Sequence, residues 1–140
     1  MRRLMGFCSL LTVIMLALSG CSGGSRASDP AGTAVREAHS AVSALVLSVQ
    51  LLQDGRATAQ VTQVSLEQCL TEVAAAQQSL VTATDADPQR RAVAAAAVKA
   101  AADTLVALGN RGAAELGPRD LDQVEAAEQA LAAASMELEA

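Results

Sequence analysis

A cysteine at the end of a short hydrophobic segment has the clearest chemical context in this sequence. Two arginines follow Met1, residues 4–18 are mostly apolar, and the motif Leu18-Ser19-Gly20-Cys21 closes the segment. A membrane-spanning helix needs about 20 apolar residues, so a segment of this length is typical of an export signal.

The motif resembles the lipobox of bacterial lipoproteins. In that family a diacylglyceryl group is attached to the cysteine sulfur, and a dedicated peptidase cleaves directly before the cysteine. The resemblance covers residues 1–21. It implies a signal peptide at residues 1–20, a lipid on Cys21 and anchoring of the mature protein at the cell envelope. No A-x-A-like site for the ordinary signal peptidase lies at the right distance. A plain secretory signal and an uncleaved anchor are the alternatives.

The other reactive side chains are sparse. Removal of the signal would take Cys8 with it and lipidation would occupy Cys21, which leaves Cys69 as the one free thiol. Cys69 lies on a helical stripe of apolar residues, so we expect a small buried side chain, with a reactive thiol as the alternative. Nucleophilic catalysis needs a nucleophile, a base and an orienting group. Cys69 with the single histidine, His39, is the one imaginable pair, and we expect no catalytic residues and no enzyme activity.

Metal binding is not indicated either. Zinc sites need several Cys or His ligands, and ferritin-like dimetal sites need Glu-x-x-His on two helices; the sequence offers neither. Asp85 and Asp87 precede Pro88 and could suggest calcium, but helix capping explains Asp87 without an ion. We therefore expect no metal and no cofactor.

Charge and composition exclude a nucleic-acid-binding protein. The sequence has 10 basic and 15 acidic side chains, a net charge of −5. Loss of Arg2 and Arg3 with the signal would leave eight basic against 15 acidic side chains, a net charge of −7. A basic face is needed to displace counterions from phosphates. The one aromatic residue, Phe7, lies in the signal, so the mature core must be built from Ala, Val and Leu in closely approaching elements.

Apolar residues recur every three or four positions along most of the mature sequence, which predicts helices. No alternating apolar run and no aromatic or β-branched cluster indicates a strand. The expected helices run from the Asp29-Pro30 cap signal to Asp54-Gly55, from about Thr58 to Thr82, from Pro88 to Leu108, and from about Asp120 towards the C-terminus. Residues 113–116 could add one turn, Thr33 is an alternative first cap, and Asp120 and Gln123 have capping-box spacing.

Four helices of similar length joined by short loops favour an all-α, antiparallel, up-down-up-down bundle. A three-helix core with a loosely docked fourth helix is the alternative. The first helix should be the most buried, and its expected inward residues are Val35, Ala38, Val42, Leu45, Val46, Val49 and Leu52, with Leu47 and Leu51 widening the face. The inward residues expected in the other helices are Val61, Leu66, Cys69, Leu70, Val73, Ala76 and Leu80; Val93, Ala97, Ala101, Leu105 and Leu108; and Leu121, Val124, Ala127, Leu131, Ala134 and Leu138.

The last helix also carries a row of acidic side chains. They are Asp120, Asp122, Glu125, Glu128, Glu137 and Glu139. A solvated face is the expected role of such a row, and a docking surface for a basic partner is the alternative.

The sequence thus divides into a signal peptide (1–20), a lipidated cysteine with a flexible linker (21–29) and a helical-bundle domain (30–140). The leading interpretation is a lipid-anchored envelope protein that acts as a non-catalytic interaction or accessory module, with a protein partner of unknown identity. The alternative is a binding protein for a lipid or other apolar ligand held between helices. A closed core favours the first, and a continuous apolar cavity of about 300 Å³ or more favours the second.

Overall fold

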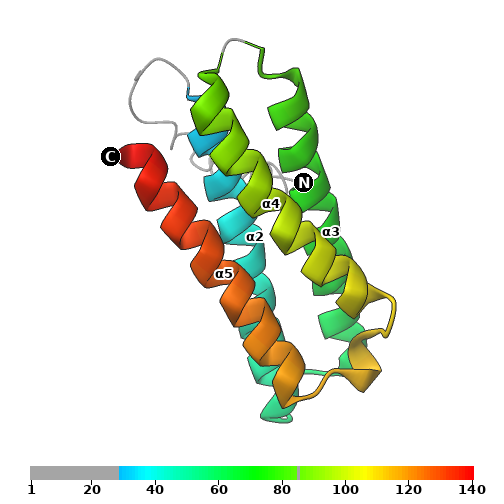
Figure 1. Cartoon of the computed structure of the whole chain (residues 1–140). Helices are drawn as coiled ribbons and strands as arrows, with labels where there is room; N and C mark the ends of the chain where they lie inside the picture. Colours follow the sequence, from blue (N-terminus) through cyan, green and yellow to red (C-terminus); the bar gives the residue numbers. More distant parts are fainter. Residues whose placement is uncertain (1–28, 85) are drawn as a thin grey trace, which may run out of the picture.

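Four long helices account for most of the described chain (Figure 1). The computed structural model describes residues 29–84 and 86–140. Its elements are α2 (Pro30–Gln53), α3 (Ala59–Thr82), α4 (Pro88–Gly109), a short 3-10 helix η1 (Ala113–Glu115) and α5 (Pro118–Glu139). These residues contain no strand, and successive long helices run in opposite directions. The predicted all-α four-helix bundle is therefore confirmed, with the expected extra turn before the last helix.

The helices surround one core. α2 packs against α3 and α5, and α4 packs against the same two helices from the other side. α2 and α4 also contact each other across the bundle, whereas α3 and α5 lie apart. The start of α2, the loop between α3 and α4, and the end of α5 share one end of the bundle, and the other two connections share the opposite end (Figure 1).

Capping side chains explain where two helices begin, and a proline marks the start of a third. Thr58 and Asp87 each accept a hydrogen bond from the backbone N–H three residues further on, at 3.3 and 3.0 Å, as expected for N-caps. Asp29 precedes Pro30 at the first helical position but makes no regular capping hydrogen bond. Because α2 starts at Pro30, the alternative cap at Thr33 is wrong.

The start of α5 differs from the prediction. The helix begins at Pro118, two positions before the expected Asp120, because proline needs no N–H partner in the first turn. Asp120 is then the third helical residue, and its Oδ2 accepts a hydrogen bond from the N–H of Gly117 at 2.8 Å. The predicted pairing of Asp120 with Gln123 as a capping box is therefore wrong.

The core is built from leucine, valine and alanine. α2 has eleven buried residues, more than any other described helix, as predicted. The largest fully buried side chains come from all four helices: Leu45, Leu66, Leu105, Leu108, Leu131, Val35, Val42, Val49, Val73, Val98, Val124 and Thr62. With all four helices contributing, the alternative of a three-helix core with a loosely docked fourth helix is wrong.

Several predicted inward positions are wrong. Leu47 in α2 and Val61 in α3 are each 56% exposed, while the neighbouring Ser48 and Thr62 are buried instead. Leu51, Leu52, Leu70, Leu121 and Ala127 are only partly buried. The buried hydroxyls replace apolar side chains because they bond to one another: Thr62 Oγ1 donates to the carbonyl oxygen of Ser48 at 3.4 Å, and Ser48 Oγ donates to Thr62 Oγ1 at 3.5 Å.

The inner face of α4 is turned relative to the prediction. Ala94 and Val98 are fully buried, whereas the expected Val93 and Ala97 are only partly buried. The second half of the helix faces the core as predicted. Alanine lies on nearly every side of the first half, so the apolar pattern there does not define one face.

Candidate functional site

The lipobox residues Leu18, Ser19, Gly20 and Cys21 lie outside the described residues, as do Cys8 and the linker up to residue 28. The described chain starts at Asp29, eight positions after Cys21. The point where a lipid-bearing segment would join the domain is therefore defined by Asp29 and its contacts.

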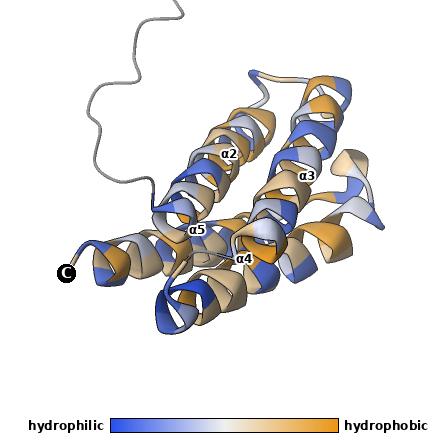
Figure 2. Cartoon of the chain, turned by 90° about the horizontal axis from the view of Figure 1, so that it is seen from above, coloured by the Kyte–Doolittle hydropathy of each residue, from blue (hydrophilic) through white to orange (hydrophobic). Residues whose placement is uncertain are grey.

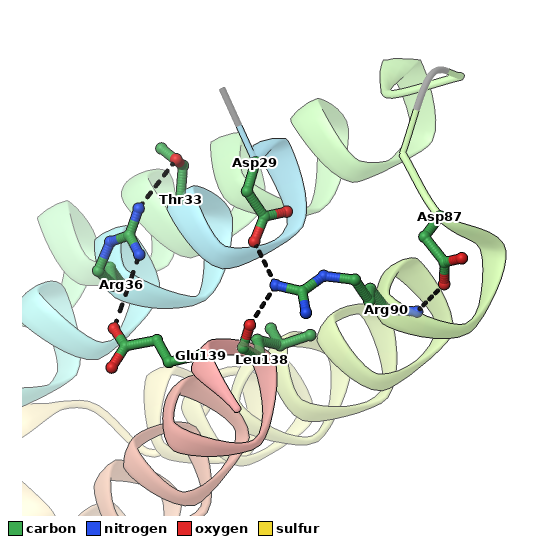
Figure 3. A network of polar contacts seen from close by, with 7 residues as sticks. All are labelled: Asp29, Thr33, Arg36, Asp87, Arg90, Leu138 and Glu139. Carbon is green, nitrogen blue, oxygen red and sulfur yellow. Dashed lines mark hydrogen bonds and ion pairs between the residues drawn. The ribbon is translucent and has the colours of Figure 1, made fainter. Parts of the chain in front are cut away.

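Arg90 holds that junction. Its Nη2 donates to Asp29 Oδ2 at 2.8 Å and to the carbonyl oxygen of Leu138 (Figure 3). The two contacts join the beginning of α2, the first turn of α4 and the end of α5. Because three segments far apart in the sequence meet at one guanidinium, Arg90 fixes the start of α2 against the rest of the bundle.

The carboxyl group of Asp29 has a lowered pKa. Burial alone would raise this pKa, but the hydrogen bond and positive charge of Arg90, together with the nearby N–H groups of Gly32 and Ala31, hold it below the ordinary value of 3.8. Asp29 is therefore ionised at neutral pH, as the ion pair requires. Its side chain is 35% exposed, so solvent weakens the pair.

A second arginine lies at the same end of the bundle. Arg36 donates to Thr33 Oγ1 at 3.2 Å, and its Nη1 lies 3.8 Å from Glu139 Oε1 (Figure 3). Both charged side chains are more than half exposed. This ion pair links α2 to the end of α5, and its stabilising effect is small.

Most of the acidic row on α5 is engaged within the domain. Ser43 Oγ donates to Glu128 Oε1 at 2.5 Å, and Gln50 Nε2 donates to Glu125 Oε1 at 3.1 Å. Asp120 is 5% exposed and pairs with Arg111. With Glu139 paired as well, four of the six acids contact other parts of the bundle. Asp122, Glu137 and Glu139 are exposed, so the expected solvated face is confirmed for these three residues.

Cys69 is buried, as its position on an apolar stripe predicted. Its side chain is 3% exposed, and burial, with a smaller contribution from the charge of Glu72, raises the pKa of the thiol to about 12. The thiol is thus protonated at neutral pH. Within the described chain no hydrogen bond joins it to His39, which is partly exposed. Residues 29–84 and 86–140 also contain no group of three or more His, Cys, Asp or Glu placed to hold a metal ion.

Two of the surface hollows lie in grooves between neighbouring helices. A groove of about 570 Å³ runs between α4 and α5 and is lined mainly by alanine, with Asp103, Thr104 and Gln123 as its polar residues. A groove of about 290 Å³ between α2 and α3 passes over Cys69 and has Glu72 and Gln68 at its edge. Both are open to solvent, and the side chains beneath them are packed. Neither groove is a cavity enclosed by the described residues.

One described helix is long and apolar enough to cross a membrane by length and composition alone, and it is α4. Five of its 22 residues are buried in the bundle. The core helix of a soluble protein can have the same length and composition, so these two properties do not show that α4 crosses a membrane.

No protein-family model matches this chain, and none of the curated proteins or solved structures matches it.

Proposed function

We propose that this protein is a lipid-anchored lipoprotein of the cell envelope, whose helical domain acts as a non-catalytic interaction or accessory module outside the cytoplasm. The observation that carries the proposal is the motif Leu18-Ser19-Gly20-Cys21 at the end of a short apolar segment preceded by two arginines. A peptidase cut before Cys21 and a lipid on its sulfur would leave the domain attached to the membrane by its N-terminus.

The spacing between the motif and the domain supports this arrangement. Seven residues separate Cys21 from Asp29. Fully extended, they span about 25 Å. α2 has 24 residues and is about 36 Å long. A short tether would therefore keep the domain near the membrane. The 54–58 and 110–117 connections lie at the end of the bundle opposite the start of α2 (Figure 1).

The use of the polar side chains supports a non-catalytic role. Arg90, Glu125 and Glu128 connect helices to one another, and Arg111 connects the loop after α4 to α5. Cys69 is buried and protonated. Polar side chains that bond to other parts of the domain make the domain rigid. A rigid surface loses little conformational entropy when it binds a partner, which suits an interaction module.

The alternative function, an apolar ligand held between helices, draws on the groove between α4 and α5. Its volume of about 570 Å³ exceeds the threshold for a small ligand. However, ligand pockets bury most of the ligand surface, and this groove is open and lined by small side chains. Organic extraction of the purified protein followed by mass spectrometry separates the two functions. A stoichiometric lipid would favour the alternative.

The anchor is tested by replacing each N-terminal cysteine in turn. Cys21→Ala should abolish labelling by a fatty-acid probe and release the protein from membranes or leave it as the longer precursor, since at least two acyl chains are needed for stable anchoring. Cys8→Ala is the matched control, and its labelling should equal that of the unmodified protein. Equal labelling of the Cys21→Ala protein would overturn the proposed anchor.

The interaction role is tested by photocrosslinking in native membranes. A photoreactive residue at Arg56, in the loop far from the tether, should yield one discrete protein adduct. The same residue at Thr84, in the loop at the tether end, is the control and should yield less of it. Absence of an adduct from Arg56, or equal yields at both positions, would contradict display of a docking surface at the far end.

A further inference from the structure

At the contact between α2 and α3, hydroxyl side chains are buried while large apolar side chains beside them are exposed. Leu47 is more than half exposed, whereas its neighbour Ser48 is buried. Val61 is exposed to the same degree, whereas its neighbour Thr62 is buried, and Val64 is 59% exposed. Folding alone favours the reverse arrangement, because burial of leucine or valine removes apolar area from water. Apolar side chains that gather on one exposed surface are typical of a binding site.

The three exposed side chains extend the groove of about 290 Å³ between α2 and α3. The residues that line this groove and reach the surface are Ser40, Ala44, Ser65, Gln68 and Glu72. Leu47, Val61 and Val64 each lie three or four positions from one of them, and residues at that spacing share a face of a helix. The groove and the three apolar side chains are here together called the α2–α3 face. The two helices pack side by side, and each carries strongly apolar residues among polar ones (Figure 2).

The charge on the α2–α3 face is negative. α3 contains no lysine or arginine. Its Glu72 lines the groove, and its Glu67 lies one turn from Val64. Each of these glutamates accepts a hydrogen bond at 2.9 Å from a neutral glutamine one turn before it. Among the described residues neither glutamate forms an ion pair. The face therefore combines an apolar surface with negative charge that no nearby cation neutralises.

We propose that the α2–α3 face binds an amphipathic helix of a partner protein. The apolar side of that helix packs on Leu47, Val61 and Val64, and lysines or arginines beside it pair with Glu67 and Glu72. A helix laid into an apolar groove, with charges at its edges, is a common mode of recognition. This inference specifies the partner of the proposed interaction module and so depends on that role, but it does not depend on the lipid.

The charges favour this partner over a second copy and over a lipid surface. A symmetric pair uses the same patch on both copies. It would bring two acidic α2–α3 faces together, which is unfavourable. Anionic lipid headgroups attract basic segments and repel acidic ones. A basic amphipathic helix supplies both an apolar side and the opposite charge.

Photocrosslinking of the full chain in its native membranes tests the proposal. A benzophenone-bearing residue at Val64 should link to one partner protein. Mass spectrometry of the linked peptide should place the link in a segment with apolar residues every three or four positions and lysine or arginine beside them. Val106, a valine of α4 that is 52% exposed, is the matched control position and should give little of this adduct.

Substitutions around the Val64 crosslinker then test the individual contacts. Leu47→Asn should lower the adduct yield roughly fivefold or more, because it removes a central apolar contact. Val106→Asn is its control and should leave the yield unchanged. Glu72→Gln should lower the yield roughly twofold at low salt and less at high salt, since salt screens the lost charge pair. Glu137→Gln, at an exposed acid of α5, is the control for that change.

Several outcomes would overturn the proposal. They are equal adduct yields at Val64 and Val106, a linked segment that is acidic or not amphipathic, a link to a second copy or to lipid alone, and an unchanged yield for Leu47→Asn or Glu72→Gln.

The proposed function and the α2–α3 face can fail separately. An adduct from the Arg56 position without one from Val64 would leave the interaction role in place and overturn the α2–α3 face. The absence of an adduct from both positions would overturn both. Loss of the predicted lipid labelling at Cys21, with the Val64 adduct present, would overturn the anchor alone.

Discussion

α2 and α4 are apolar helices of similar length, and each starts at a proline that follows an aspartate. They differ in how much of their surface is buried in the core. Eleven of the 24 residues of α2 are buried, against five of the 22 in α4. Each of the two helices contacts the other three long helices, but Ser43 and Gln50 of α2 also bond to acids on α5. Apolar composition alone therefore does not decide which helix is central.

Side-chain size accounts for the difference. α2 alternates small alanines with valine and leucine along one stripe, so its neighbours pack against both large and small side chains. α4 presents alanine on most sides, and an alanine side chain offers little area to bury. The large side chains of α4 that matter to the core are Val98, Leu105 and Leu108.

The largest expected effect is in α2. Leu45→Ala should lower the free energy of unfolding by about 2–5 kcal/mol, because Leu45 is 1% exposed and its loss leaves a cavity. Leu47→Ala, two positions away and 56% exposed, is the matched control and should change it by about 0.5 kcal/mol or less. Urea unfolding of residues 29–140, followed by circular dichroism, measures both. Similar losses would contradict the assigned face of α2.

The second prediction addresses the turned face of α4. Ala94→Leu should cost about 1–3 kcal/mol, because Ala94 is fully buried between close helices and has no room for added methyl groups. Ala97→Leu should cost less, and Ala95→Leu, at an exposed position, should be nearly neutral. The same unfolding experiment applies. If Ala97→Leu lowered the free energy of unfolding more than Ala94→Leu, Ala97 would face the core, as the sequence predicts, and the turned face would be wrong.

The third prediction concerns the end where α2 and α4 meet through Arg90. Arg90→Gln should cost about 1 kcal/mol at neutral pH, because it removes an ion pair and weakens the bond to the carbonyl oxygen of Leu138. The lowered pKa of Asp29 means that the folded state favours its carboxylate, so the ion pair stabilises the fold above pH 3.8 and is lost as pH falls through the folded-state pKa.

Unfolding at two pH values checks this reasoning. The difference between Arg90→Gln and the unmodified protein should be largest near pH 7 and should shrink below pH 3.8. Asp29→Asn is the control. Because it removes the same ion pair, the double variant should lose less free energy of unfolding than the sum of the two single losses. A difference that persists unchanged at low pH would show that Arg90 acts without the carboxylate.

The smallest effect is expected for the polar contacts between α2 and α5. Glu128→Ala should cost about 0.5 kcal/mol more than Glu137→Ala, since Glu128 accepts a hydrogen bond from Ser43 and Glu137 is exposed. Both variants replace glutamate by alanine within α5, so the change in helix propensity is the same in each and does not affect the comparison. Equal losses in urea unfolding would contradict a stabilising role for the hydrogen bond between Ser43 and Glu128.

Local signals in the sequence were sufficient to place three of the four long helices, and they missed the start of α5 by two residues. Aspartate before proline marks the starts of α2 and α4, Thr58 caps α3, and Gly55 and Gly112 adopt positive φ after α2 and α4. Each signal acts through bonds or backbone angles within a few residues. The burial of Cys69 was predicted for the same reason, since its neighbours on the helical stripe are apolar.

Contacts between helices could not be predicted in this way. The role of Asp120 depends on Arg111, that of Asp29 depends on Arg90, and the buried hydroxyls of Ser48 and Thr62 depend on each other. The sequence predicts a solvated acidic row on α5 because the partners of its paired members, such as Ser43, lie far away in the chain. Only the packed bundle brings these residues together.

The sequence by itself determined the class of fold, the number and approximate limits of the helices, and the motif at Cys21 that underlies the proposed anchor. The tertiary structure decided which helix is central, which side of α4 faces inward and which acids are paired. The reason is the range of the interactions. Helix limits depend on neighbours along the chain, whereas the orientation of an alanine-rich helix depends on side chains that the other helices bring against it.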